Sequence, residues 1–125
     1  MSKKLEFEAE KKPFTEVELE LMTLVWDLGE CTVKDVQTKV QATRKLAYTS
    51  VATIMKILEQ KKVLASRKSD RAHTYHPLIS REAYEAASLR YLANNLFHGD
   101  PSSMVMRLLS DNKLSKDELK AIQKI

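Results

Sequence analysis

The chain of 125 residues is poor in the residues from which most catalytic loops and metal centres are built. It has one cysteine, Cys31, two glycines and three prolines. A single cysteine excludes an internal disulfide and a cysteine-based metal cage, and it suits a reducing cytoplasm. Two glycines leave no room for a glycine-rich phosphate loop or a nucleophile elbow. The sequence therefore argues against an enzyme, and we expect no catalytic residue, cofactor or metal.

Long apolar runs are missing as well. No stretch approaches the roughly 20 apolar residues that a membrane-spanning helix requires. The start of the chain, MSKK followed by alternating glutamates, lacks the apolar segment of a signal peptide. With 43% hydrophobic and 30% charged residues, the composition is that of one globular domain or a small domain with an appendage. We therefore expect a cytoplasmic protein without a membrane contact.

Positive charge is concentrated in the middle of the chain. The formal net charge is +4, but residues 34–76 alone hold ten Lys and Arg against three acids, a net +7. Residues 1–33 have a net charge of −4 and residues 77–125 of +1. Such an excess attracts a polyanion, most commonly nucleic acid, but charge alone fits a solvated basic surface equally well.

Start and stop signals predict a series of helices. Thr15 and Glu18 have the spacing of a capping box, and Gly29 follows the apolar stripe that they open. Ser115 and Glu118 have the same capping-box spacing near the end of the chain. The predicted helices cover 16–28, a short segment from Thr32, a segment from near Ala47, Ser80 to about Phe97, a segment from Pro101, and one from Ser115.

Two strands are expected between the third and fourth helices. Residues 63–68 and 71–77 flank a polar turn and form a hairpin, with Tyr75 and His73 on its inner face. Three helices followed by a hairpin with a basic tip is the order of a winged helix-turn-helix. Such a module places its third helix in the DNA major groove.

The third helix has two contrasting faces. An apolar stripe that includes Met55 is spaced for burial, and the opposite face consists of four polar residues: Thr49, Ser50, Thr53 and Lys56. Small hydroxyl residues are poor helix formers and add nothing to a core, but they hydrogen-bond to bases and phosphates. This face is the first indication of a DNA interface.

The C-terminal helices hold more apolar surface than they can bury alone. A unit near 40 residues usually needs disulfides, metal or oligomerisation, and disulfides are excluded here. We therefore predict a flexible arm over 1–13, a winged-helix domain over 14–79 and a helical dimerisation region over 80–125. The expected dimerisation residues are Tyr84, Ala87, Tyr91, Leu92, Leu96, Met104, Leu108, Leu119 and Ile122.

Five short patterns run along the chain. They are E-x-x-x-M-x-x-x-W in the first helix, Y-T-S-V-x-T in the third, R-x-x-x-Y-x-P-L in the wing, and S-M-V-x-x-L-L and L-S-x-D-E-L near the C-terminus. With them the chain resembles the penicillinase and methicillin-resistance repressors of the BlaI/MecI type over nearly its whole length. The resemblance implies a mainly α fold with a small β-hairpin. It also implies a homodimeric repressor of β-lactam resistance or another stress response, which binds a double-stranded operator with dyad symmetry, often built on TACA and TGTA halves.

By position, the resemblance implies a set of DNA-binding residues on the third helix and in the wing. They are Tyr48, Thr49, Ser50, Ala52, Thr53, Lys56, Arg67, Lys68 and Arg71. A small apolar group such as Ala52 can pack on a thymine methyl. The first turn of this helix has no Arg or Lys for a guanine contact, so the operator sequence stays open.

Other departures from the family pattern concern the turns and the cleavage site. Lys62 and Asp70 stand where glycine is common, so Lys62 must take an unfavourable φ or its turn must differ. Antibiotic-responsive members are cut at an Asn-Phe bond when a membrane sensor protease is triggered. The matching place here reads Arg107-Leu108, so the cleavage site does not carry over, and whether a partner sensor protease exists stays open.

Two other functions stay open at this point. A small-ligand-gated winged-helix regulator would need a pocket between the wing domain and the dimer helices. A winged-helix protein–protein adaptor would bind little DNA, contrary to the basic segment over 34–76. Cys31, next to a helix start, is expected to be a passive, half-buried thiol, with a redox-sensitive thiol of lowered pKa as the alternative.

Overall fold

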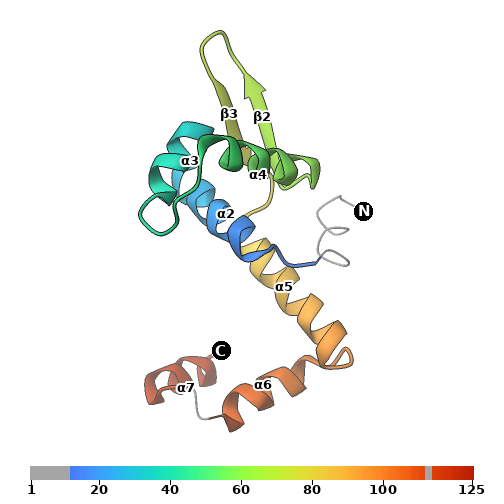
Figure 1. Cartoon of the computed structure of the whole chain (residues 1–125). Helices are drawn as coiled ribbons and strands as arrows, with labels where there is room; N and C mark the ends of the chain where they lie inside the picture. The colour runs from blue at the N-terminus through green and yellow to red at the C-terminus, as the bar shows by residue number, and fades with distance from the viewer. Residues whose placement is uncertain (1–11, 112–113) are drawn as a thin grey trace.

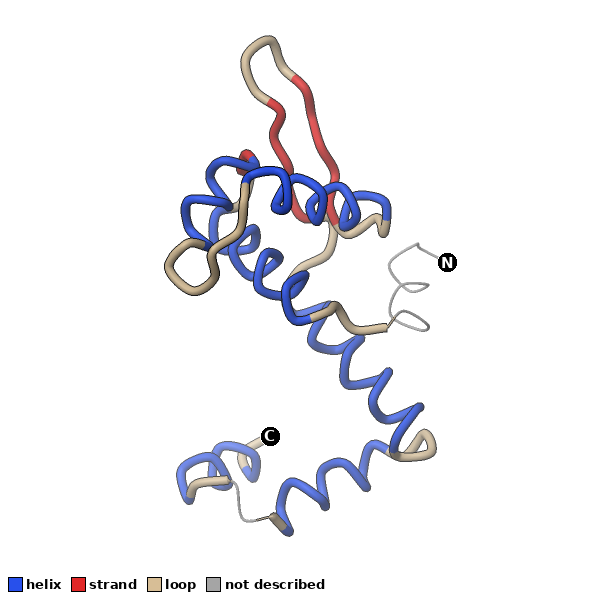
Figure 2. The backbone as a smooth tube through the Cα atoms, viewed as in Figure 1, coloured by secondary structure: helices blue, strands red, loops and turns tan. Residues whose placement is uncertain are grey.

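The computed structural model describes residues 12–111 and 114–125 and shows a mainly helical chain with one small sheet (Figures 1 and 2). The predicted mainly α fold with a β-hairpin is confirmed. The flexible arm predicted over 1–13 falls largely outside the described residues. The elements in chain order are α2 (Glu16–Leu28), β1 (Cys31–Thr32), α3 (Val33–Val40), α4 (Tyr48–Gln60), β2 (Leu64–Lys68), β3 (His73–Pro77), α5 (Arg81–Leu96), α6 (Pro101–Ser110) and α7 (Lys116–Gln123).

Side-chain caps fix where the helices begin. At the start of α2, the Glu18 N–H donates to the Thr15 hydroxyl over 3.2 Å, and the Thr15 N–H donates to the Glu18 carboxylate over 2.9 Å. Equivalent capping boxes open α3 and α7. Gly29, at φ 77°, ends α2 in a conformation that glycine adopts without strain. The predicted helix boundaries at these sites are confirmed.

The sheet has three antiparallel strands in the order β1-β3-β2. β2 and β3 form the predicted hairpin, with Ser66 paired to Tyr75. On its other side Tyr75 pairs with Cys31 of β1. The sequence did not reveal β1, because a strand of two residues has no alternation and pairs with a segment far along the chain.

The inner face of the hairpin is only partly as predicted. Tyr75 is buried, but His73 is exposed although its ring stacks on that of Tyr75 with centroids 4.9 Å apart. The two side chains share a face because they are two residues apart on a strand. The interpretation of His73 as an inward core residue is wrong, since the strand extends beyond the core at this end.

One hydrophobic core holds α2, α3, α4 and the base of the hairpin together. Its fully buried side chains are Leu21, Met22, Val25, Val36, Val40, Val51, Met55, Leu58, Val63 and Leu64. The same cluster continues past the hairpin through Ile79, Ala83 and Tyr84. The start of α5 is therefore packed on the winged-helix part of the chain.

The C-terminal helices extend away from this core. In Figure 1, α5 leads out of the winged-helix part, and α6 and α7 turn back beneath it. Neither α6 nor α7 has a buried residue in the part of the chain that the structure describes. Leu96, Met106 and Leu108 are among the exposed apolar side chains here.

The turn between α4 and β2 contains a backbone conformation that favours glycine. Lys62 has a φ of 65°, the unfavourable conformation expected from the missing glycine. We expect Lys62→Gly to raise the free energy of unfolding by about 1 kcal/mol, because it removes this strain. Urea unfolding of Lys62→Gly beside Lys62→Ala, which keeps the strain, measures the effect. Equal stabilities of the two variants would contradict it.

Candidate nucleic-acid interface

The polar face of α4 is open to solvent. Thr49, Ser50, Thr53 and Lys56 are exposed, and so is Tyr48 at 50%. They lie there because Val51, Met55 and Leu58 bury the opposite face in the core. Ala52 lies between the two faces, half-buried and packed against the core, so only part of its methyl group is accessible.

The N-terminus of α4 is built differently from those of the other described helices. α2, α3, α5, α6 and α7 each begin with a Ser, Thr or Asp whose side chain accepts a backbone N–H. α4 begins after Ala47, which has no side-chain cap. Its first backbone N–H groups are therefore left to another acceptor, and a phosphate suits them.

The loop before α4 is anchored to α2. Arg44 forms ion pairs with Glu20 over 3.0 Å and with Glu16 over 3.3 Å, and the Thr43 hydroxyl also donates to Glu20. These hydrogen bonds from Thr43 and Arg44 lower the pKa of Glu20. Arg44 thus holds the start of α4 in place, a role that sequence spacing alone does not reveal.

A second ion pair anchors the other end of α4. The Lys61 ammonium lies 2.8 Å from a carboxylate oxygen of Glu18, whose side chain is 9% exposed. Burial alone would raise the pKa of Glu18, but the hydrogen bonds from Lys61 and Thr15 lower it overall. A buried carboxylate with these partners stays charged, and it ties the C-terminal end of α4 to the start of α2.

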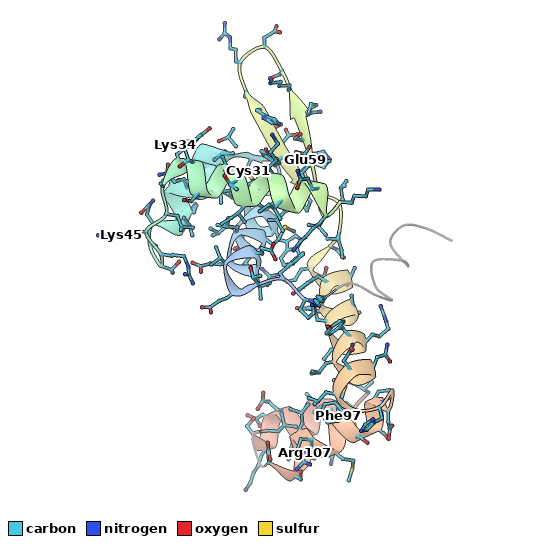
Figure 3. The ribbon with its side chains drawn as sticks, turned by 45° about the vertical axis from the view of Figure 1, so that its right-hand side comes forward. Cys31, Lys34, Lys45, Glu59, Phe97 and Arg107 are labelled. Carbon is cyan, nitrogen blue, oxygen red and sulfur yellow. The ribbon has the colours of Figure 1, made fainter. Side chains whose placement is uncertain are left out.

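Most of the basic residues in 34–76 are free of such partners. Arg44, Lys61 and Arg67 form ion pairs. Seven others form no ion pair within the described ranges: Lys34, Lys39, Lys45, Lys56, Lys62, Lys68 and Arg71. Figure 3 shows Lys34 and Lys45 at the outer edge of this part of the molecule. This unneutralised charge is what a phosphate backbone requires.

The wing presents the basic residues that the sequence assigned to it. Arg67, Lys68 and Arg71 are exposed at or near the end of the hairpin. The hairpin projects away from α5, beside α4 (Figure 1). Arg67 forms an ion pair of 2.6 Å with Glu30, which precedes β1.

If the wing contacts DNA, Glu30 and a phosphate compete for the Arg67 guanidinium. We expect Glu30→Gln to raise affinity for operator and random DNA by about two- to fivefold, because it frees one cation. For the same reason, the slope of log affinity against log salt concentration should become steeper by about one. Fluorescence anisotropy at several salt concentrations measures this. Glu82→Gln removes the same charge from exposed α5 and is the control. If both variants bind like the wild type, Arg67 makes no phosphate contact.

Cys31 is buried in the core rather than half-buried as expected. Its side chain is 2% exposed. Burial first, and then the nearby carboxylates of Asp35 and Glu30, raise its pKa from 9.0 to about 11. The alternative of a redox-sensitive thiol with a lowered pKa is therefore wrong, because burial and like charge outweigh the helix dipole.

The raised pKa of Cys31 predicts a loss of stability in alkali. Between pH 9 and pH 11 the thiol ionises in the unfolded chain but stays protonated in the folded one, so ionisation favours unfolding. We expect the free energy of unfolding to fall by about 2 kcal/mol more over this window in the wild type than in Cys31→Ala. Urea unfolding at intervals across the window tests this, and parallel curves for the two proteins would refute it.

The predicted dimerisation residues divide into two groups. Tyr84 and Ala87 are buried within the chain itself, at 7% and 4% exposure. Tyr91, Met104 and Leu119 are half-buried, and Leu92, Leu96, Leu108 and Ile122 are exposed. Only the residues beyond Ala87 are thus available to a partner.

The fold and this surface define a winged helix-turn-helix DNA-binding protein. The penicillinase repressor family matches residues 14–125, and the chain belongs to this family of transcriptional repressors, which are not enzymes. Within the described part of the chain, no helix has the length and apolar character needed to cross a membrane.

Individual relatives are similar at moderate identity. The chain is 24% identical over 111 residues to the penicillinase repressor of Bacillus licheniformis, covering 89% of this chain and 87% of that protein. It is 35% identical over 68 residues to the transcriptional regulator BlaI of Mycobacterium tuberculosis, covering 54% and 49%.

Two solved structures share the winged-helix fold. The solution structure of the DNA-binding domain of the repressor BlaI matches with a TM-score of 0.52 and 25% identity, covering 60% of this chain and 93% of that one. The solution structure of monomeric Bacillus licheniformis BlaI in complex with the blaP half-operator matches with a TM-score of 0.52 and 23% identity, covering 60% and 92%.

Proposed function

We propose that the chain is a homodimeric repressor that binds a double-stranded operator with dyad symmetry. The observation that supports this most strongly is the exposed polar face of α4 beside a basic wing, among seven basic side chains that form no ion pair with the residues the structure describes. α4 enters the major groove, and the wing lies on the backbone. The exposed hydroxyls of Thr49 and Ser50 reach base edges, and Lys68 and Arg71 neutralise phosphates.

Several features support binding through the end of α4. Its uncapped N-terminus offers backbone N–H groups to a phosphate, and Arg44 and Lys61 hold the helix at both ends. Thr53 donates its hydroxyl to the Thr49 carbonyl over 2.9 Å, so it presents lone pairs rather than a proton to the DNA. The site is therefore preorganised before DNA arrives.

The exposed apolar side chains of α5, α6 and α7 support a homodimer. Leu89, Leu92 and Leu96 follow one another at helical spacing on α5 and are all exposed. Between α5 and α6 lies a cavity of about 440 Å³, lined largely by apolar side chains including Leu89, Val105 and Leu108. A second copy covers such a surface, and two linked half-site contacts bind far more tightly than one. Release of the operator then follows when the contact between the two copies is weakened.

The name of one relative refers to penicillinase, and we propose a resistance or other stress-response gene as the target of this chain. Because a repressor must meet the chromosome, we place it in the cytoplasm. The matching cleavage position, Arg107-Leu108, lies within α6, and the inducing signal and any partner protease are best sought among the genes next to the operator.

Binding to a labelled duplex with a TACA/TGTA dyad, beside a shuffled duplex, tests the proposal at two salt concentrations. A preference of about 10³ or more near physiological salt would support it. Equal, steeply salt-dependent binding to both duplexes would keep DNA as the partner but discard this operator. No binding to either would favour the protein–protein adaptor.

A further inference from the structure

The start of α5 is attached to α2 by three aromatic side chains, Phe14, Trp26 and Tyr84, which we call the aromatic joint. The rings of Phe14 and Tyr84 stack almost in parallel, with centroids 4.4 Å apart and planes 6° from each other. The Trp26 ring lies 5.7 Å from that of Tyr84, at 43°. Tyr84 therefore contacts Phe14, which lies just before α2, and Trp26 in the last turn of that helix.

Directional contacts accompany the ring packing. The Phe14 N–H donates to the Tyr84 hydroxyl over 2.9 Å, and the Trp26 indole N–H donates to the Ile79 carbonyl over 2.9 Å. The Arg81 guanidinium lies over the Trp26 ring, 5.2 Å from the ring centroid. Hydrogen bonds and ring contacts of this kind fix an angle as well as a distance.

Phe14 before α2 and Trp26 near its end thus both pack against one side chain of α5, Tyr84. Adjacent domains usually move relative to one another unless the interface between them is extensive and apolar. Here Phe14, Ile79, Ala83 and Tyr84 all belong to the hydrophobic core of the winged-helix part. The first turn of α5 is therefore fixed to the core of the winged-helix part through Ala83 and Tyr84.

The length of α5 makes its angle important for DNA binding. Its 16 residues span about 24 Å, so a tilt of about 10° at the joint moves the far end by about 4 Å. That is close to the rise of one base pair, about 3.4 Å. In a dimer joined through the C-terminal helices, a loose joint would let the distance between the two α4 helices vary by the rise of one base pair or more.

We propose that the aromatic joint positions the DNA-binding part of each subunit and thereby sets the half-site spacing that the protein accepts. This inference rests on the proposed dimeric operator binding. Phe14, Trp26 and Tyr84 are positioning residues that lie away from the DNA face. By fixing the angle between α5 and the DNA-binding part, they restrict the dimer to operators whose two half-sites are one set distance apart.

The rigidity of the joint can be measured without DNA. In the full chain, ¹⁵N relaxation should give one rotational correlation time for amides of 14–79 and 81–96. Tyr84→Leu should give two, because it removes the stacked ring and the hydroxyl acceptor. Val36→Ala, a core substitution outside the joint, should lower stability and keep one. Separate tumbling of the two parts in the wild type would overturn the proposal.

Operator spacing tests the function of the joint. Affinity is measured for a single half-site and for dyads whose half-sites are shifted in steps of one base pair. The wild type should prefer its best spacing by about a hundredfold, and Tyr84→Leu by less than about threefold, with half-site affinity unchanged. Tyr84→Phe keeps the ring and loses only the hydroxyl, so its preference for the best spacing should lie between these two values. It replaces Tyr84→Leu in the test if that variant does not fold.

The outcomes separate this inference from the proposed function. If Tyr84→Leu lowers half-site and dyad affinity by the same factor and keeps the spacing optimum, the joint is only part of the core and the inference is wrong. If the wild type binds neither the single half-site nor any of the dyads, the proposed operator binding is wrong, and the proposed role in spacing is wrong with it. Relaxation still decides whether the joint is rigid.

Discussion

Replacing Leu92 and Leu96 by glutamate should dissociate the proposed dimer and lower the affinity for a dyad operator by about 10²- to 10⁴-fold, the factor that linking two sites contributes. Both side chains lie on the outer part of α5 and are 42% and 61% exposed in one chain. Their charges are therefore tolerated in the monomer but not in an apolar contact between two copies.

Sedimentation and DNA binding together measure this effect. Affinity for a single half-site should stay the same, because α4 and the wing are unchanged. Leu78→Glu is the matched control, since Leu78 is also an exposed leucine, at 54%, but follows the hairpin. A double variant that remains dimeric at micromolar concentration would show that the contact between copies lies elsewhere.

The double variant Thr49→Ala and Ser50→Ala, which removes both hydroxyls, should lower operator affinity by about ten- to a hundredfold and leave the proposed dimer intact. Both residues lie in the first turn of α4 and are exposed. Alanine is a better helix former than either, so folding is not impaired. The lost affinity therefore reports hydrogen bonds to DNA.

Thr23→Ala is a suitable control for the α4 variant. The Thr23 hydroxyl donates to the Leu19 carbonyl within α2, on another part of the surface, so its removal should not change DNA binding. Binding to shuffled DNA should fall less than binding to operator, because the phosphate contacts proposed for Lys68 and Arg71 do not depend on these hydroxyls. Unchanged operator affinity in the double variant would refute the assignment of α4 as the recognition helix.

Local signals predicted much of this fold. The capping boxes at Thr15, Thr32 and Ser115 each start a helix in the structure, because a cap depends on residues three apart. The polar face of α4 could likewise be read from helical spacing, since the apolar stripe opposite it has to be buried. These features depend on neighbours in the sequence.

Features that join distant segments could not be predicted in this way. Glu30 pairs with Arg67, and Cys31 with Tyr75, through contacts that no local pattern encodes. Tyr84 and Ala87 show the same limit. Their spacing on α5 predicts a buried face but does not say whether the winged-helix part or a second copy buries it.

Because the core continues into α5, the winged-helix part cannot be cut from the rest of the chain at the end of the hairpin without exposing core residues. A fragment that ends at residue 79, the boundary expected from the sequence, would leave Phe14 and Trp26 without the ring that covers them. Ala83, Tyr84 and Ala87 are buried in the intact chain, so a fragment that retains them must reach at least to residue 87. Packing thus carries the core of the winged-helix part at least to Tyr84, in the first turn of α5.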